Sequence, residues 1–366
     1  MLTKADDYPI HQTPDPIAFA GTDRNFYDRY FFHGYSVEGD LFFAAALGVY
    51  PHLNIMDAAF CVRIGDKQYN LHASRHLNME RMDTQVGPIR IDVIEPLQKL
   101  RIAVDDNEHG IVADIVFDGR AAPVEEPRAI RRNGPRTLQD FTRMTQFGAY
   151  SGWLRAGGQE IRFENSKVIG VRDRSWGVRH VGERDPQPMV PAQESQFHWF
   201  WIPAVFDDRT VLFYLNEDGN GEAWNAGLVI ARDGEKAEHF HGAKLDVIYQ
   251  PGTRWPASGT LTAPDGRGGS YRIDLQPGAR FFMTGLGYMN PDWGHGVNKG
   301  PLAVGYDEID HTDTIGFKPP HTYIEAFTRL VMTTPEGQQL QGVGAWETLS
   351  MGRYDPLGLK GMFDTP

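Results

Sequence analysis

Apolar and polar residues alternate along much of the chain with the period of two that is typical of β-strands. Residues 100–104 (Leu-Arg-Ile-Ala-Val) and 111–115 (Ile-Val-Ala-Asp-Ile) show this alternation and predict antiparallel strands with one face in water. Residues 41–49 are almost wholly apolar and predict a strand that is covered on both faces. The other strands predicted in the first half are residues 25–36, 55–63, 68–73, 89–94, 149–154 and 159–163.

The second half shows the same pattern of short apolar runs separated by turn residues. It opens with residues 196–202, the most aromatic run of the chain, and continues with residues 211–216 and 224–231. Short strands spaced about 8–12 residues apart are typical of a β-barrel or a β-sandwich. We therefore predict an all-β chain with few helices. Asp-Gly or Glu-Gly pairs predict later turns at residues 233–234, 265–266 and 336–337.

Changes in composition divide the chain into segments. Residues 1–24 are polar and proline-rich and predict an N-terminal arm. Two β-rich halves follow at residues 25–190 and 191–358, and residues 359–366 form a tail. Within the first half, residues 119–145 combine prolines with several arginines and predict a linker or a wrapping crossover.

The composition agrees with a β-rich globular protein and excludes some partners. Aromatic residues make up 12% of the chain, and 40 glycines and 24 prolines supply turns. The formal charge of −12 argues against binding to nucleic acid or to anionic lipid. No apolar run reaches the roughly 18 residues of a membrane span, and the N-terminus lacks the pattern of a secretory signal. We therefore expect a cytoplasmic protein without nucleic-acid partners or membrane insertion.

The densest group of chemically active residues lies in residues 171–180, which read Val-Arg-Asp-Arg-Ser-Trp-Gly-Val-Arg-His. Buried charges need partners because an unpaired one costs several kcal/mol. We interpret the segment as the border of a cavity, where Asp173 pairs with an arginine and Trp176 forms a wall. The alternative is an Asp–Arg clasp that only pins two parts of the chain together.

Other residues extend this candidate site. Trp199, Trp201 and Trp293 suit the walls of an elongated apolar ligand, although the same residues also suit a barrel core. Tyr214 and Asn216 share a strand face, so they can present a hydroxyl and an amide to one ligand. The imidazoles nearest in sequence to the aromatic walls are His198 and His295, and Arg179 adds a further cation.

The sequence offers little support for other site classes. Dinucleotide, Walker and Gly-x-Ser-x-Gly motifs are absent. His239 and His241 are spaced to share a strand face, but no carboxylate at a fixed spacing completes a metal shell. The single cysteine, Cys61, excludes an intramolecular disulfide and has the apolar neighbours of an inert buried thiol. We expect neither a metal ion nor a cofactor.

The segment around Asp173 resembles the Asp-His-x-Trp-Gly signature of carotenoid 1,2-hydratases and of the wider group of two-barrel, lipocalin-like proteins called AttH-like. Residues 50–60 and 287–296 resemble segments of uncharacterised bacterial members of that group. The resemblance implies two consecutive lipocalin-like antiparallel β-barrels with few short helices across roughly residues 25–358. It also implies proton transfer to an alkene and addition of water.

Carried over residue by residue, Asp173 and Trp176 match the signature, and Tyr214 corresponds to a tyrosine of the second barrel. Asn216 stands where the resemblance would place an acid. Arg174 stands in place of the signature histidine, and a guanidinium stays protonated, so it is a poor general acid. Such an arginine suits related pericyclases and isomerases, where it can polarise a carbonyl or carboxylate.

These observations predict a cofactor-independent enzyme that hydrates, isomerises or cyclises an isoprenoid-, steroid- or polyketide-like substrate. The alternative is a non-catalytic, lipocalin-like carrier of a hydrophobic small molecule. We expect a monomer or a homodimer. The predicted catalytic residues are Asp173, Arg174, Tyr214 and His295. The predicted substrate-binding residues are Trp176, Arg179, His198, Trp199, Trp201, Asn216 and Trp293.

Overall fold

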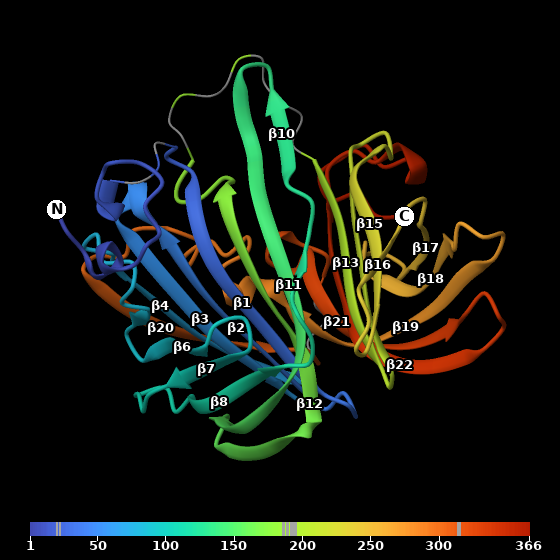
Figure 1. Ribbon diagram of the computed structural model, residues 1–366, viewed down its shortest axis with the longest axis horizontal. Helices are drawn as coiled ribbons and strands as arrows, with labels where there is room; N and C mark the ends of the chain where they lie inside the picture. Colours follow the sequence, from blue (N-terminus) through green and yellow to red (C-terminus); the bar gives the residue numbers. More distant parts are fainter. Residues whose placement is uncertain (20, 22, 185–186, 188–189, 191–195, 313–315) are drawn as a thin grey trace.

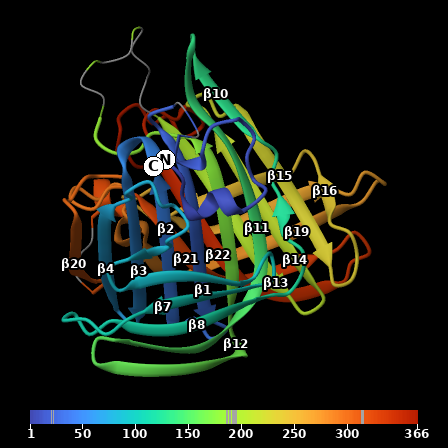
Figure 2. The same ribbon diagram turned by 60° about the vertical axis from the view of Figure 1, so that its left-hand side comes forward.

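The computed structural model describes residues 1–366 except 20, 22, 185–186, 188–189, 191–195 and 313–315 (Figure 1). The described residues form two large antiparallel sheets and only single-turn helices, which confirms the all-β prediction. The first sheet curls into a nearly closed barrel, and the second forms a half-barrel (Figures 1 and 2). The predicted boundary between the halves, after residue 190, falls beside residues outside the described part of the chain.

The first sheet has 13 strands, in the order β20-β4-β3-β2-β1-β12-β11-β8-β7-β6-β5, with β9 and β10 also paired to β11. Its strands are β1 (Phe26–Ser36), β2 (Leu41–Tyr50), β3 (Ile55–Ile64), β4 (Lys67–His76), β5 (Gln85–Val86), β6 (Ile89–Glu95), β7 (Lys99–Val104), β8 (Val112–Gly119), β9 (Val124–Glu125), β10 (Ala129–Asn133), β11 (Arg136–Ala156), β12 (Gln159–Val178) and β20 (Leu302–Asp310).

The second sheet has nine strands, in the order β16-β15-β14-β13-β22-β21-β19-β18-β17. Its strands are β13 (Phe197–Phe206), β14 (Arg209–Glu217), β15 (Ala223–Arg232), β16 (Glu238–Phe240), β17 (Lys244–Tyr249), β18 (Pro256–Pro264), β19 (Ser270–Phe282), β21 (Tyr323–Thr333) and β22 (Gln339–Met351). The single-turn 3₁₀ helices are η1 (Lys4–Asp7), η2 (Ile17–Phe19), η3 (Pro51–Leu53), η4 (Met283–Leu286), η5 (Pro319–His321) and η6 (Asp355–Leu357).

Hydrophobic patterning placed most strands correctly. Every residue of β2 is buried, as its continuous apolar sequence predicted. For β16 to β22 the sequence indicated turns but no strand bounds. Residues 119–145 differ from the prediction, because the structure has β9, β10 and the start of β11 there in place of a linker or crossover. The prolines there do not interrupt a strand, because Pro127 lies between β9 and β10 and Pro135 lies in the turn between β10 and β11.

A row of glycines crosses the first sheet where its long strands change partners. Gly34 on β1, Gly170 on β12, Gly148 on β11 and Gly119 on β8 are aligned as neighbours. A Cβ atom at Gly170 would lie 2.1 Å from the carbonyl oxygen of His33, so the backbones approach too closely for any side chain. The pairing of β11 with β8 ends at this row, and beyond it β11 pairs with β9 and β10. Beyond this row, β11 runs to the top of the view in Figure 1 with β10 beside it, between the rest of the first sheet and β13 of the second sheet.

The two sheets share an apolar core between them. It joins first-sheet residues such as Phe31 and Phe42 to second-sheet residues such as Trp201, Phe281 and Phe327. Phe42 stacks on Phe281 with their ring centroids 5.0 Å apart. Separate apolar cores fill the inside of each sheet. The space between the sheets is thus largely filled, and a cavity can exist only where this shared core stops.

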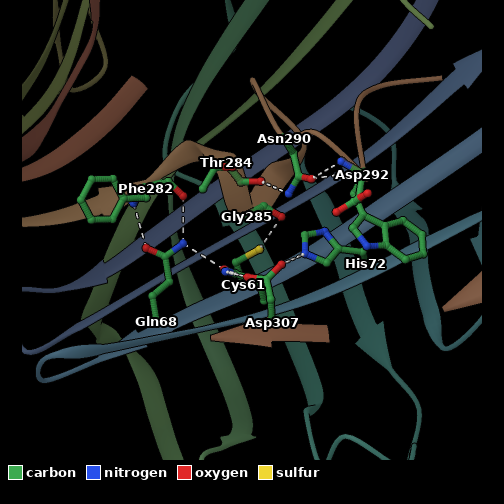
Figure 3. A network of polar contacts seen from close by, with 11 residues as sticks. Cys61, Gln68, His72, Phe282, Thr284, Gly285, Asn290, Asp292 and Asp307 are labelled. Carbon is green, nitrogen blue, oxygen red and sulfur yellow. Dashed lines mark hydrogen bonds and ion pairs between the residues drawn. The ribbon is translucent and has the colours of Figure 1, made fainter. Parts of the chain in front are cut away.

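The segment that contains η4 is held against the first sheet by polar contacts (Figure 3). Gln68 on β4 donates from Nε2 to the carbonyl of Phe282 and accepts at Oε1 from the Phe282 N–H, both at 2.8 Å. Cys61 on β3 donates from Sγ to the carbonyl of Gly285 at 3.0 Å. The cysteine is buried and free, in agreement with an inert thiol.

The strand β20 belongs to the second half of the chain but completes the first sheet by pairing with β4. Asp307 on β20 accepts hydrogen bonds from Asn70 Nδ2 at 2.6 Å and from His72 Nε2 at 2.8 Å (Figure 3). These contacts hold η4 and β20 against β3 and β4, so both ends of the segment that joins η4 to β20 are attached to the first sheet. Among the described residues, no helix is long and apolar enough to cross a membrane.

Candidate functional site

A cavity of about 320 Å³ lies between the two sheets. On the first-sheet side it is bordered by the parts of β1, β11 and β12 that lie beyond the row of glycines. This volume is within the usual range of small-molecule sites, about 300–1,000 Å³. Its apolar wall includes Phe31, Phe197, Trp199, Met283, Leu349 and Met351. Its polar wall includes Tyr27, Arg143, Asp173, Arg179, Asn216, Tyr288, Tyr323 and Glu347.

Two buried carboxyl groups face each other across β21 and β22 at the edge of this cavity. Glu325 and Glu347 are directly opposite in the strand register, and their exposed fractions are 0% and 6%. The pKa of each carboxyl group is raised to about 8. Burial is the main cause in both, and the charge of Glu325 contributes to the raised pKa of Glu347. Because two adjacent buried carboxylates cannot both ionise easily, the pair retains a proton near neutral pH.

The hydrogen bonds around the pair orient both carboxyl groups. Glu347 Oε1 accepts from Trp199 Nε1 at 2.7 Å and from the hydroxyl of Tyr323. Glu325 Oε1 is 2.9 Å from Nδ1 of His33, whose pKa burial lowers to about 4. His33 is therefore neutral, and its Nδ1 shares a hydrogen bond with the Glu325 carboxyl. Of the two carboxyls, only Glu347 lines the cavity, so it is the one that a ligand can reach.

A second charged group lies on the first-sheet side of the cavity. Arg143 on β11 lies 3.7 Å from Asp173 Oδ2 and 3.5 Å from Glu126 Oε2, and its guanidinium covers the Trp199 ring at 4.9 Å. Burial raises the pKa of Asp173, and Arg143 opposes this shift. Burial lowers the pKa of Arg143, but Glu126 and Asp173 outweigh it and raise that pKa. Arg143 thus places a positive charge beside Asp173 in the wall of the cavity.

The structure brings four of the predicted site residues together. Asp173, Arg179, Trp199 and Asn216 all line the cavity. They come from β12, the residue after it, β13 and β14, so both sheets contribute. Asn216 is fixed by its neighbour Asn225, which donates from Nδ2 to Asn216 Oδ1 at 3.2 Å.

Arg174 and Trp176 do not line this cavity. Successive side chains of a strand point to opposite faces, and Asp173 faces the cavity, so both residues lie on the other face of β12. Arg174 forms an ion pair with Asp28 at 2.6 Å, and Trp176 is 40% exposed beside the N-terminal arm. The charged and aromatic residues of segment 171–180 are thus divided between the two faces of β12.

The remaining predicted residues lie behind the cavity wall or away from it. Tyr214 and Trp201 are buried in the core between the sheets. His198 is held by Ser350 Oγ and by the carbonyl of Arg353. Trp293 stacks on His72, with their ring centroids 5.4 Å apart.

His295 is also outside the cavity but touches one of its walls. Its Nε2 lies 2.8 Å from the carbonyl of Leu286, and its ring packs edge-on against Tyr288 at 4.4 Å. Burial lowers its pKa well below the ordinary value, so the imidazole is neutral. It can position Tyr288 but does not reach the cavity itself.

The sequence interpretation missed Glu325, Glu347, Arg143 and Tyr323. A signal for the two acids existed, because each occupies the apolar face of its strand. Glu325 lies on the same face of β21 as the core residues Tyr323 and Phe327. Glu347 lies on the same face of β22 as the core residues Ala345 and Leu349. An acid at such a position is unusual in a half-buried strand. The register that places the two acids opposite each other could not be read from either strand alone.

The carboxyl pair predicts how stability depends on pH. The folded pKa of about 8 exceeds the ordinary glutamate value of 4.5, so the folded chain binds more protons than the unfolded chain between these values. The free energy of unfolding is therefore expected to fall as pH rises through this window. Calorimetric Tm values at about pH 7 and about pH 9 test this, because the buried histidines with lowered pKa values affect stability only at lower pH. The double variant E325Q/E347Q should lose most of the decrease; an unchanged decrease in that variant would contradict it.

Comparison with known proteins shows the fold but no activity. A model of a family of unknown function, DUF8625, matches residues 2–360. No curated protein matches the chain. The crystal structure of an AttH protein from Nitrosomonas europaea is similar, with a TM-score of 0.52 and 12% identity, over 93% of this chain and 98% of that one. At this identity the likeness shows a shared fold alone, and at that level it confirms the expected resemblance to the AttH-like group.

Two further solved structures align over most of the chain. Kievitone hydratase from Nectria haematococca has a TM-score of 0.49 and 12% identity, over 96% of each chain. CghA, determined with Sch210972, has a TM-score of 0.48 and 10% identity, over 89% of each chain.

Proposed function

The chain belongs to DUF8625, a family of unknown function, and we propose that it is an enzyme that transfers protons to and from a hydrophobic small molecule. The substrate would occupy the cavity between the two sheets. The observation that carries this proposal is the buried pair of Glu325 and Glu347, of which Glu347 borders the apolar cavity. A carboxyl group that keeps its proton near neutral pH can act as a general acid.

The arrangement of charges supports separate roles for the two sides of the cavity. Glu347 would give its proton to a carbon or oxygen atom of the substrate, and Glu325 would share the negative charge that remains. Asp173 would accept a proton from the substrate or from an attacking water. Its partner Arg143 would favour the ionised form against the opposing effect of burial, because a nearby cation stabilises the charged form.

The same proton transfers can serve several reactions. Protonation, addition of water and loss of a proton from that water give hydration, and protonation followed by loss of a different proton gives isomerisation. Protonation, attack of a second double bond on the cation and loss of a proton from the new cation give cyclisation. The apolar wall suits an isoprenoid-, steroid- or polyketide-like body, because such molecules bury apolar area against rings such as Phe31 and Trp199.

Deuterium incorporation tests the proposal whichever of these products is formed. A panel of unsaturated isoprenoids, steroids and polyphenols would be incubated with the protein in deuterium oxide and examined by mass spectrometry. An acid–base enzyme should place solvent deuterium on a substrate carbon. Binding of panel members without incorporation would contradict the proposal and would favour a carrier.

The variant D173N is expected to lower the rate of incorporation at least about tenfold while the ligand affinity changes little. The amide keeps the size of the side chain but cannot accept the proton. Rates with and without the substitution, together with affinity from quenching of tryptophan fluorescence, separate these two effects. An equal loss of affinity and rate would assign Asp173 to binding instead.

A further inference from the structure

Arg179 is a half-buried cation in the cavity wall, and one edge of its guanidinium has no hydrogen-bond partner among the described residues. It follows β12 directly and lines the cavity. Its Nε and Nη2 atoms are buried and have no hydrogen-bond partner in the part of the chain that the structure describes. Its guanidinium lies over the Tyr27 ring at 4.4 Å and near the Tyr288 ring at 5.8 Å. The two tyrosines hold the group in place without using the Nε–Nη2 edge.

The two neighbouring arginines, Arg143 and Arg29, have charged or polar partners among the described residues. Arg143 lies between the carboxyls of Glu126 and Asp173. Arg29 donates from Nη1 to the hydroxyl of Tyr288 at 2.8 Å and from Nη2 to the carbonyl of Leu286 at 3.2 Å. Among the described residues, Arg29 and Arg143 each have one nitrogen, Nε, that is buried without a hydrogen bond, whereas Arg179 has two, Nε and Nη2, on one edge of the guanidinium. A buried N–H without a partner is costly, so a ligand that satisfies the free edge gains affinity.

The chemistry of the free edge defines the ligand group. The Nε–Nη2 edge of a guanidinium presents two parallel N–H donors, which match the two oxygens of a carboxylate. An acidic enol in its ionised form offers oxygens of the same charge. An amide or an ester offers a neutral oxygen and gains less from a buried cation.

We infer that the ligand of this cavity is an amphiphilic anion, a hydrophobic molecule with one acidic oxygen group that binds to the free edge of Arg179. Its apolar body would lie along Trp199 and Phe197. This inference rests on the proposed function for the reaction that follows, but the charge preference in binding is independent of any turnover. It narrows the substrate class from hydrophobic molecules in general to hydrophobic acids.

A pair of probes that differ only in charge tests the inference. 1-Naphthylacetate and 1-naphthylacetamide have the same ring system, and calorimetry gives the Kd of each. The wild-type protein should bind the carboxylate at least about tenfold more tightly than the amide. In R179Q this preference should disappear because the carboxylate loses affinity, while binding of the amide stays the same. R179K, which keeps the charge but not the paired donors, should give an intermediate preference.

The matched control is R174Q. Arg174 lies on β12, where it pairs with Asp28 and does not line the cavity, so this variant removes an equal charge without touching the cavity. It should keep the full preference for the carboxylate. Equal affinity of the wild-type protein for the two probes, binding of neither probe, or a preference that survives in R179Q would each overturn the inference. A preserved preference without deuterium incorporation would instead reject only the proposed proton-transfer reaction.

Discussion

Replacing Glu347 by glutamine is expected to slow proton transfer to a bound substrate by about 100-fold or more, the usual contribution of a general acid. Glutamine has nearly the same shape and can still accept from Trp199 Nε1 and from the Tyr323 hydroxyl. Ligand affinity should therefore stay close to that of the wild-type protein. The rate of deuterium incorporation under single-turnover conditions measures the chemical step, and fluorescence titration measures affinity.

A suitable control is E217Q. Glu217 on β14 is also a partly buried acid with a raised pKa, and it accepts from the hydroxyl of Tyr354 at 2.6 Å. It does not line the cavity, so the same chemical change there should leave the rate unaltered. Full activity of E347Q, or an equal loss in E217Q, would show that Glu347 does not supply the proton.

The partner of Glu347 has a separate, diagnostic effect. In E325Q the neighbouring negative charge is absent, and this charge is one cause of the raised pKa of Glu347. The pKa of Glu347 should therefore fall, and the alkaline limb of the pH–rate profile should move to lower pH. A merely structural role for Glu325 would reduce the rate at all pH values without moving that limb.

The fold was largely predictable because its signals are local. Alternation within β7 and the continuous apolar run of β2 each report the burial of one strand. Contacts between distant segments have no such signal. The pairing of β20 with β4 and the position of η4 against Gln68 depend on the whole topology, so neither was foreseen.

The candidate site was predictable only in part, for a related reason. Asp173, from the densest group of charges in the sequence, and Trp199, from its most aromatic run, both line the cavity. Arg174 and Trp176 do not, because successive side chains of a strand point to opposite faces, so neighbours in sequence are not neighbours in space. The acid pair was missed because each glutamate alone resembles an ordinary polar residue. Only the register of β21 and β22 makes them one group.

The largest expected effect on stability comes from a substitution outside the cavity, G170A. The added Cβ would lie 2.1 Å from the carbonyl oxygen of His33 and 3.0 Å from the Cα of Gly34. Both contacts are with backbone atoms of the adjacent strand, so no side-chain rotation can relieve them. We expect a loss of at least about 3 kcal/mol in the free energy of unfolding, in the range of severe core substitutions. Urea denaturation followed by circular dichroism gives this value.

The control G316A adds the same methyl group at a position with no atom within 4 Å, and should change stability little. The consequence of G170A for the site follows from its place on β12. Asp173 is three residues further along the same strand, so any shift of β12 away from β1 moves it relative to Arg143. Protein that remains folded should therefore lose proton-transfer rate as well as stability. Wild-type stability in G170A would mean that β1 and β12 do not approach as closely as their aligned glycines indicate.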